Sequence, residues 1–389
     1  MCLLGLMFLG CRSQTGKQVI ARESENTILG KDSALWHFFG ALDSLKANPG
    51  RTLSIVHIGD SHIQADYFSG MLRVLLQEKF GNAGRGLIFP YAVARTNEPV
   101  SYRSSATGEW KAVRSVINPD SAAIGISGIS LFSKSAQAGF SIRTGSQKGM
   151  SYAFRQVKLF SKVAGPVNTH LSGNPEMSVS AQKRSDFVSE FNLPDTSSYL
   201  NISFSADHRV DVHGLVLSNG QGGILYHTIG VNGATFRTYN SASLFMQQLP
   251  ELKPDLLIVS LGTNESCAGK FDIAEFEEQV RKFMEAIRQR GGSCSVLFTT
   301  PADNCRLRKG KPSANDRVPL IGRCLKSYAA RNGHAVWDLY EVMGGRGSMK
   351  SWKLQGLATG DYVHFTRKGY ELQGRLLFDA LLNACAQRH

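Results

Sequence analysis

Two short segments near opposite ends of the chain carry the residue types of an activated serine. Ser61 closes a Gly-Asp-Ser motif directly after an apolar, β-branched run at 53–58. Asp361 precedes His364 by three residues in an Asp-Tyr-Val-His motif. At this spacing the carboxylate can bond to Nδ1 of the histidine, which leaves Nε2 free to deprotonate a serine. The segments predict Ser61 as nucleophile, His364 as base and Asp361 as the group that orients the base.

Two further segments can supply hydrogen-bond donors for a developing oxyanion. Asn264 stands in a Gly-Thr-Asn-Glu loop after the apolar run 255–261, where its side-chain amide can point at the reacting group. Gly233 lies in a Gly-Val-Asn-Gly-Ala block, where a glycine can present a bare backbone N–H. We expect the donors to be the amides of Ser61 and Gly233 and the side chain of Asn264, with Gly230 as the alternative glycine.

The elements that must position these residues alternate along the chain. Short apolar runs predict buried strands, and stretches with apolar residues at helical spacing predict helices between them. Strands are expected at 53–58, 255–261, 295–301 and 335–339, and helices at 34–47, 66–80, 272–290, 315–332 and 366–386. This alternation favours a parallel sheet covered on both faces, with ligands bound at the carboxyl ends of its strands.

The middle of the chain follows a different pattern. From 102 to 226 it is rich in Ser, Gly, Thr and Asn and carries short alternating runs between turn residues. Such runs are typical of a β-sandwich, here inserted into the α/β domain. We therefore divide the chain into an α/β domain at 34–101 and 227–389 and a β-sandwich-like module at 102–226.

The first residues are typical of a targeting segment. Residues 1–11 contain a short apolar stretch that ends at Cys11, after a small residue, and 12–33 are polar without periodicity. This arrangement resembles a bacterial lipoprotein signal, in which Cys11 becomes the lipidated first residue and 12–33 a flexible tether. The expected location is the bacterial cell envelope, as a periplasmic or outer-membrane lipoprotein. A signal peptide with an ordinary cysteine is the alternative.

Composition excludes several classes of protein. Apolar residues make up 42% and charged residues 19%, which excludes disorder as the main state, and no apolar run reaches the ~18 residues of a membrane span. The net charge of +13 comes from scattered basic residues, so it suits an anionic partner without predicting nucleic-acid binding. The tightest basic cluster, at 306–311, has a solvated loop as its simpler explanation. A disulfide between Cys305 and Cys324 is left open.

Taken in order, the motifs resemble those of the SGNH (GDSL-type) hydrolases. The Gly-Asp-Ser motif, the glycine block, the Gly-x-Asn motif and the Asp-x-x-His motif follow one another as in that family, over about 50–100 and 226–386. The resemblance implies a three-layer α/β/α flavodoxin-like fold with a β-rich insertion. It also implies a triad of Ser61, Asp361 and His364, and an oxyanion hole of Ser61, Gly233 and Asn264. Glu265 departs from the Asp that the family often has at this position.

The Gly-Asp-Ser-His sequence and the inserted module look like the peptidoglycan O-acetylesterase branch. That branch implies an acetylated cell-envelope glycan as the partner, ester hydrolysis through an acetyl-serine, and no metal or other cofactor. An O-acetyltransferase on the same scaffold and a non-catalytic glycan-binding lipoprotein are the alternatives. The oligomeric state is left open.

Other chemistry-bearing residues receive structural roles. We expect His62 to line a pocket or the surface, because adjacent side chains diverge and Ser61 occupies the turn. His57 lies within a predicted strand and is expected to be a hydrogen-bonded core histidine. Trp110 and Tyr102 can stack on sugars, but aromatic residues in a β-module more often belong to its core.

Overall fold

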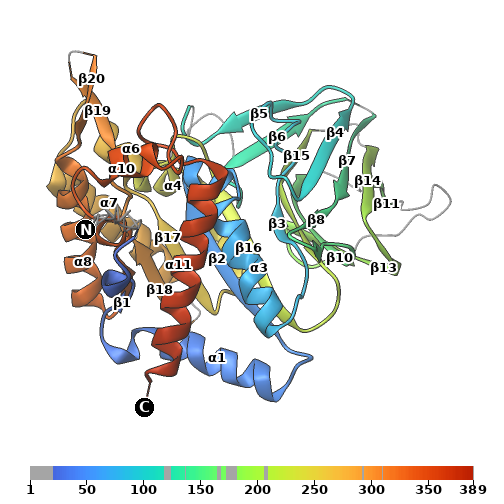
Figure 1. Cartoon of the computed structure of the whole chain (residues 1–389). Coiled ribbons are helices and arrows are strands. Elements are labelled where there is room, and N and C mark those ends of the chain that lie inside the picture. Colours follow the sequence, from blue (N-terminus) through green and yellow to red (C-terminus); the bar gives the residue numbers. More distant parts are fainter. Residues whose placement is uncertain are drawn as a thin grey trace, which may run out of the picture.

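A central sheet runs through one half of the molecule (Figure 1). The computed structural model describes residues 21–117, 124–135, 137–163, 168–171, 182–205, 209–290, 293–308 and 310–388. Residues 1–11 and Cys11, the predicted signal and lipidation site, lie outside these ranges. Within them the central sheet has six strands, in the order β1 (Ile28–Leu29), β21 (Ala335–Trp337), β18 (Ser295–Thr299), β17 (Leu256–Ser260), β2 (Thr52–Gly59) and β16 (Gly223–Gly230).

All neighbours in this sheet are parallel except β1, which pairs antiparallel with β21 at the edge. If the parallel strands are numbered along the chain, their spatial order is second, first, third, fourth, fifth. This is the flavodoxin-like order, and it reverses direction between β2 and β17. The expected doubly wound sheet is therefore confirmed. The point where the strand order reverses lies between β2 and β17. The segments that contain Ser61 and Asn264 begin at the carboxyl ends of these two strands.

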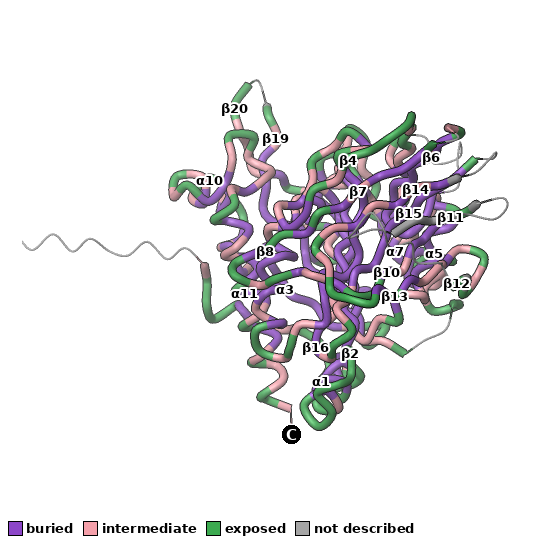
Figure 2. The backbone as a smooth tube through the Cα atoms, turned by 90° about the vertical axis from the view of Figure 1, so that its right-hand side faces the viewer, coloured by how far each residue is buried: buried purple, intermediate pink, exposed green. Residues whose placement is uncertain are grey.

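The parallel strands are buried on both faces. In β2, Ile55 packs into one hydrophobic cluster, whereas Val56 and Ile58 pack into another. Successive side chains of a strand point to opposite faces, so a continuous apolar run can fill two layers at once. Figure 2 shows the resulting buried centre, with exposed residues along the outer helices.

Helices cover both faces of the sheet. Phe38 of the first helix and Leu377 of the last share a cluster with Ile55, whereas Phe283 and Leu325 share the other with Val56. The α-helices are α1 (Trp36–Ala47), α2 (Ser61–Gln64), α3 (Phe68–Phe80), α4 (Phe236–Asn240), α5 (Phe245–Gln248), α6 (Thr263–Cys267), α7 (Ile273–Gln289), α8 (Arg317–Asn332), α9 (Leu339–Val342), α10 (Ser348–Leu354) and α11 (Arg367–Ala386). Short 3₁₀ turns are η1 (Glu23–Glu25), η2 (Asp32–Leu35) and η3 (Leu249–Leu252).

In the described residues of the inserted part all regular elements are strands, and this part lies beside β16 in Figure 1. One sheet contains β12 (Gln182–Lys183), β13 (Val188–Ser197), β10 (Phe154–Val163), β15 (Val210–Ser218), β6 (Ile129–Ser133), β5 (Lys111–Arg114) and β3 (Gly86–Ile88). The other contains β11 (Asn168–Leu171), β14 (Tyr199–Ser205), β7 (Ala138–Thr144) and β4 (Tyr102–Thr107). Two small hairpins are β8 (Ser146–Gln147) with β9 (Met150–Ser151), and β19 (Cys305–Arg308) with β20 (Lys311–Ala314).

Both sheets of the insertion share one apolar core. Phe140 and Ile202 of one sheet lie in the same buried cluster as Leu159 and Val212 of the other. No helix occurs among the described residues of 102–226 before β16, as the alternating pattern predicts. The strand pairing does not agree with the predicted domain boundaries at 102 and 226.

The difference concerns a strand at each end of the insertion. We assigned β3 to the α/β domain, but it pairs antiparallel with β15 of the inserted sheet. We assigned Gly223–Tyr226 to the insertion, but they pair in parallel with β2. Strand pairing joins segments more than a hundred residues apart, and a local sequence pattern does not reveal it.

The prediction of a flexible tether at 12–33 is wrong for its described part. Ile28 and Leu29 add the edge strand β1 to the central sheet. The side chain of Asn26 is buried, donates to the carbonyl of Leu376 and accepts from Trp337 Nε1 at 2.9 Å each. These partners lie more than 300 residues away, so the polar composition of the segment conceals its attachment.

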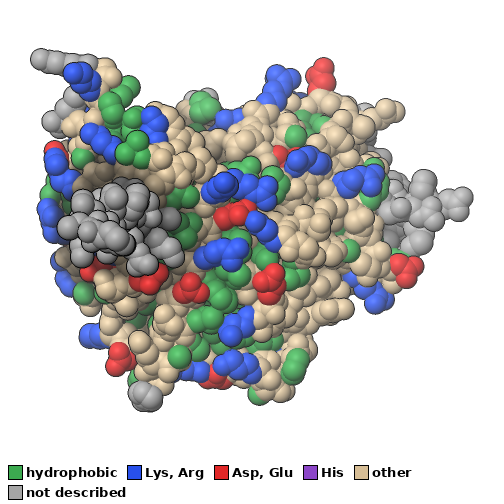
Figure 3. Space-filling model, viewed as in Figure 1, with side chains coloured by type: hydrophobic (Ala, Val, Ile, Leu, Met, Phe, Trp, Pro, Cys, Tyr) green, Lys and Arg blue, Asp and Glu red, His purple; other side chains and the backbone are tan. Residues whose placement is uncertain are grey.

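The basic residues are scattered over the surface, as the sequence suggests, and the described cysteines are unpaired. Figure 3 shows Lys and Arg scattered over the visible face, with acidic side chains between them. Arg306 and Lys311 belong to the β19–β20 hairpin. The described cysteines, including Cys305 and Cys324, are free thiols, so the disulfide left open by the sequence is absent from them. No helix in the described ranges is long and apolar enough to cross a membrane.

Candidate active site

Ser61 begins helix α2 at the carboxyl end of β2. The backbone of Gly59 permits this tight turn, because a Cβ there would lie 2.3 Å from the side chain of Ile63. Asp60 caps the helix, and its Oδ1 accepts a 3.0 Å bond from the His62 amide. The hydroxyl of Ser61 is thereby held at the end of the sheet where doubly wound folds bind ligands.

A chain of hydrogen bonds joins Ser61 to the loop that precedes α11. The Oγ of Ser61 lies 2.9 Å from Nε2 of His364, and Nδ1 of His364 lies 2.7 Å from Oδ2 of Asp361. A proton can therefore pass from the hydroxyl to the imidazole while the carboxylate holds the ring. The structure brings together the three residues that the motifs predict.

Asp361 is in turn fixed by its own loop. Its Oδ1 accepts bonds from the Thr359 hydroxyl at 2.6 Å and from the amides of Val363 and His364 at 3.0 Å. Partial burial alone would raise the pKa of Asp361, but these hydrogen bonds and that from the His364 ring hold it well below its ordinary value. The carboxylate is ionised at neutral pH and suited to stabilise an imidazolium ion.

Asn264 lies in α6, directly after β17, and reaches across to the turn of Ser61. Its Nδ2 lies 2.9 Å from the Ala234 carbonyl and 3.3 Å from Oδ2 of Asp60. These contacts fix the amide beside the Ser61 turn and the glycine block. A pocket of about 200 Å³ lies against it, lined also by Arg237, Lys270 and Phe271 among others.

Two buried carboxyl groups lie beneath this edge of the sheet. Burial raises the pKa of Asp60 to about 7 and that of Glu265 also to about 7, and the negative charge of Asp60 adds to the rise at Glu265. Glu265 accepts a 2.9 Å bond from the Phe236 amide, which ties α6 to α4. The residue that departs from the family pattern thus has a structural contact.

The surroundings of Gly230 and Gly233, the two candidate oxyanion donors in the glycine block, differ in the structure. Gly230 packs against α2, where a Cβ would lie 2.2 Å from the Gln64 amide nitrogen. Gly233 has a φ of +86°, and a Cβ there would meet only the Val116 side chain, at an ordinary contact distance of 3.8 Å. Its neighbours tie it to the site, because the Asn232 amide donates to Gln64 at 2.8 Å and Ala234 accepts from Asn264. Gly233 therefore suits the role of donor, and Gly230 serves close packing.

His62 lies beside the base without being positioned as one. Its ring centroid is 5.1 Å from that of His364, and its Nδ1 lies 2.8 Å from the Tyr370 hydroxyl. Burial lowers the pKa of His62 to about 3, so the ring is neutral. The residue is partly buried beside the base.

The remaining side chains singled out in the sequence belong to the core. His57 is fully buried and bonds to the hydroxyls of Tyr226 and Ser260 at 2.7 Å each. Tyr102 is buried, and Trp110 packs against Phe140 and Phe204. Among the described residues no group of three or more His, Cys, Asp or Glu side chains could hold a metal ion.

The sequence reasoning missed a buried ionic cluster just beyond Ser61. Asp66, with φ +56°, accepts from Arg73 and from Arg85 at 2.7 Å each, and all three side chains are buried. Burial would raise the pKa of Asp66, but the two guanidinium groups hold it at about 2. Arg73 also donates to Tyr152 of the insertion at 3.0 Å. A charged residue at 73 within the apolar stretch 71–76 was the available signal.

Known proteins resemble this chain in family and in fold. Residues 209–372, which contain Asn264 and His364, match the GDSL-like Lipase/Acylhydrolase family. A solved structure of a peptidoglycan O-acetylesterase has a TM-score of 0.78 and 25% identity, covering 92% of this chain and 99% of that chain. No curated protein matches the sequence.

Two other similar structures match about two-fifths of the chain. The lipase/acylhydrolase from Enterococcus faecalis has 20% identity, a TM-score of 0.31, and coverage of 42% of this chain and 77% of that chain. An acetylxylan esterase from Geobacillus stearothermophilus has 18% identity, a TM-score of 0.31, and coverage of 42% and 73%. The family match and the peptidoglycan O-acetylesterase structure, which covers nearly the whole chain, carry the conclusion. The chain is an ester-bond hydrolase with the SGNH fold, and it resembles the GDSL-type acylhydrolases over residues 209–372.

Proposed function

We propose that this protein removes O-acetyl groups from a cell-envelope glycan, peptidoglycan or a related polysaccharide, through an acetyl-serine intermediate. The observation that carries the proposal is the hydrogen-bonded series from Ser61 through His364 to Asp361. The choice of substrate is supported by the likeness to a peptidoglycan O-acetylesterase over 92% of the chain.

The first half-reaction transfers the acetyl group to the enzyme. Ser61 Oγ attacks the ester carbonyl carbon, and its proton passes to Nε2 of His364. The negative charge that develops on the carbonyl oxygen is met by the amides of Ser61 and Gly233 and by the side chain of Asn264. The C–O bond to the sugar then breaks, and His364 returns the proton to the departing sugar hydroxyl.

The second half-reaction regenerates the serine. A water molecule gives a proton to His364 and attacks the acetyl carbonyl carbon, and the bond to Ser61 Oγ breaks as that oxygen regains a proton. Acetate is released. Asp361 keeps the imidazole in the required tautomer in both steps and stabilises its cationic form.

Attachment to a membrane is a further part of the proposal. The lipoprotein-like sequence at 1–11 supports lipidation of Cys11 and a location in the cell envelope, where the proposed substrate is found. Labelling of expressing bacteria with a radioactive fatty acid checks it. Label in the wild-type chain and none in Cys11→Ala supports the anchor, and equal label in both removes it.

Acetate release tests the substrate. We expect the purified protein to release acetate from O-acetylated peptidoglycan faster than from acetylated xylan, and also to hydrolyse p-nitrophenyl acetate. Faster release from acetylated xylan would contradict the proposed glycan. Acetyl groups appearing on an added sugar acceptor instead of free acetate would show an acetyltransferase.

A further inference from the structure

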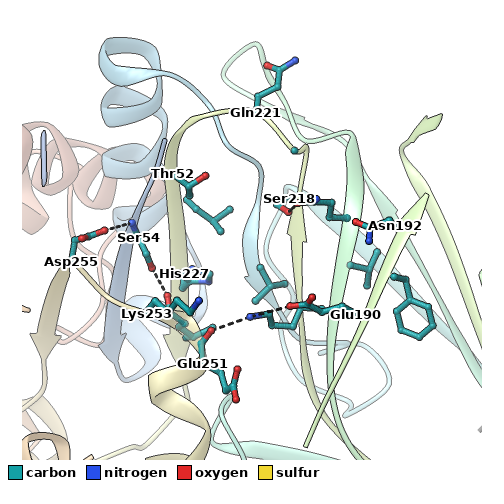
Figure 4. Close-up of a pocket in the computed structure, with 18 of the residues that line it drawn as sticks. Thr52, Ser54, Glu190, Asn192, Ser218, Gln221, His227, Glu251, Lys253 and Asp255 are labelled. Carbon is teal, nitrogen blue, oxygen red and sulfur yellow. Dashed lines mark hydrogen bonds and ion pairs between the residues drawn. The ribbon is translucent and has the colours of Figure 1, made fainter. Parts of the chain in front are cut away.

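A pocket of about 440 Å³ lies between the central sheet and the inserted sheet (Figure 4). Thr52 and Ser54 line it from the first residues of β2, and β10, β13 and β15 form the opposite wall. Ser61 follows the other end of β2. Since a strand rises about 3.3 Å per residue, roughly 20 Å separates the pocket from the nucleophile. The pocket is therefore distinct from the site described above, and its volume falls in the range of small-molecule sites.

Polar groups from the inserted sheet surround an apolar floor. Val216 and Leu252 are buried in its lining, together with the partly buried Leu225. Lys158 and Asn192 also line the pocket. The Nζ of Lys158 is held 3.2 Å from the Glu251 carbonyl and 3.5 Å from the carboxylate of Glu190. An apolar floor with fixed donors and acceptors at its rim complements a sugar ring, which has C–H faces and hydroxyl edges.

His227 gives the pocket an unused donor. Its Nδ1 accepts a 3.1 Å bond from the Leu87 amide, which places the ring hydrogen on Nε2. That Nε2 is buried and has no hydrogen-bond partner among the described residues. Burial lowers the pKa of His227 to about 3, so the donor is neutral. A buried N–H without a partner is costly, and a ligand hydroxyl or amide oxygen would satisfy it.

The charges of the lining favour a ligand without net charge. Lys158 and Lys253 stand with Glu190, Glu251 and Asp255 around the same space. Lys158 is already paired with Glu190, and Asp255 accepts a 2.8 Å bond from the Ser54 amide. The acidic side chains outnumber the basic ones by only one, and both donors and acceptors are available for hydroxyl groups.

We propose that this pocket is a second carbohydrate site, which binds a neutral sugar unit of a glycan chain away from Ser61. The site itself follows from its lining, and only the choice of a glycan polymer rests on the proposed function. A polymer held at this site raises the effective concentration of its other units near the protein. The pocket would thus favour polymeric over small ester substrates.

Two disaccharides without ester groups test the site directly. Calorimetric titration of the wild-type protein with N,N′-diacetylchitobiose, and separately with cellobiose, should show saturable binding of at least one. Preference for chitobiose would assign the His227 donor to an acetamide oxygen, and equal binding would assign it to a hydroxyl. Absence of saturable binding of both disaccharides would overturn the proposal.

Variants locate the binding. Lys158→Ala and Asn192→Ala should each weaken binding by about tenfold, which corresponds to the loss of one hydrogen bond or two. Lys162→Ala, at an exposed position of the same strand as Lys158, should bind normally. Asn192 is exposed, so its replacement does not threaten folding. Equal affinity in Asn192→Ala, Lys158→Ala and Lys162→Ala would place the binding elsewhere and contradict the proposal.

The same proteins separate this inference from the proposed function. All three variants should hydrolyse p-nitrophenyl acetate at the wild-type rate, whereas the two lining variants should lose activity on O-acetylated polymer. Normal acetate release without disaccharide binding would contradict the second carbohydrate site and leave the proposed function standing. Disaccharide binding without any acetate release would contradict the proposed function and leave the second carbohydrate site standing.

Discussion

The carboxylate of Asp60 and the side-chain amide of Asn264 lie 3.3 Å apart, beneath the turn that carries the nucleophile. Asp60 is fully buried and caps α2 through the His62 amide, so it links the Ser61 turn to an expected oxyanion donor. Its raised pKa, about 7, means that neutral pH lies within its titration. The stability of this edge of the sheet should therefore depend on pH.

The first prediction concerns Asp60→Asn. Between pH 4 and 7 the folded protein holds a proton on Asp60 that the unfolded chain has released, so stability should fall as pH rises through this window. Asparagine still caps the helix but does not titrate. Melting temperatures from pH 4 to 8 should fall less in Asp60→Asn than in the wild type. Asp195→Asn, at an exposed position, is the control, and parallel curves for all three proteins would refute the buried titration.

Asn264→Ala should lower kcat by about 10²–10³ with little change in KM, because the donor meets charge that develops only in the transition state. Asn240→Ala is a suitable control, since the Asn240 side chain bonds to Gln279 away from the triad. Kinetics with p-nitrophenyl acetate and melting temperatures on the same samples distinguish a catalytic role of Asn264 from a purely structural one. A folded Asn264→Ala protein with normal kcat would exclude Asn264 from the oxyanion hole.

Asp361→Asn should lower kcat by up to about 10⁴, because the amide favours the wrong tautomer of His364. The loop should survive, since an asparagine oxygen can still accept from the Thr359 hydroxyl and the His364 amide. The pH profile of kcat/KM should change as well, because the ionised carboxylate stabilises the imidazolium. If Asp361 only shaped the loop, Asp361→Asn would melt earlier and keep its turnover per folded molecule.

Replacing Gly230 or Gly233, the two glycines of the block at 230–234, should have different effects. Gly230→Ala places a methyl group 2.2 Å from the Gln64 amide nitrogen, so it should destabilise the protein by about 1–3 kcal/mol. Gly233→Ala has space for the methyl group but strains a φ of +86°, and it should chiefly reduce kcat by moving the donor. Urea unfolding and kinetics on both variants check this. The reverse pattern would make Gly230 the donor.

The sequence was sufficient to predict the parallel sheet, and the contacts among Ser61, His364 and Asp361, for a physical reason. Strands such as β2 are buried on both faces and are therefore mostly apolar, and Ser61 and Asn264 follow shortly after the carboxyl ends of β2 and β17. The Asp361–His364 contact is local, three residues apart, so spacing alone predicts it. These features depend on short segments.

What the sequence did not reveal depends on distant partners. The edge strand β1 pairs with residues about 300 positions away, and β3 pairs with β15 across most of the insertion. The cluster of Asp66 with Arg73 and Arg85 needs three polar groups that become neighbours only after folding. The second pocket likewise has walls from separate parts of the chain, so no single motif marks it.

The rate of acetate release by Ser61→Ala, per folded molecule, tests the central claim most directly. The account predicts a rate at least about 10³-fold below that of the wild type, because Ser61 carries the acetyl intermediate. Ser243→Ala, at an exposed serine, should release acetate at the wild-type rate. A folded Ser61→Ala protein that releases acetate as fast as the wild type would contradict the account.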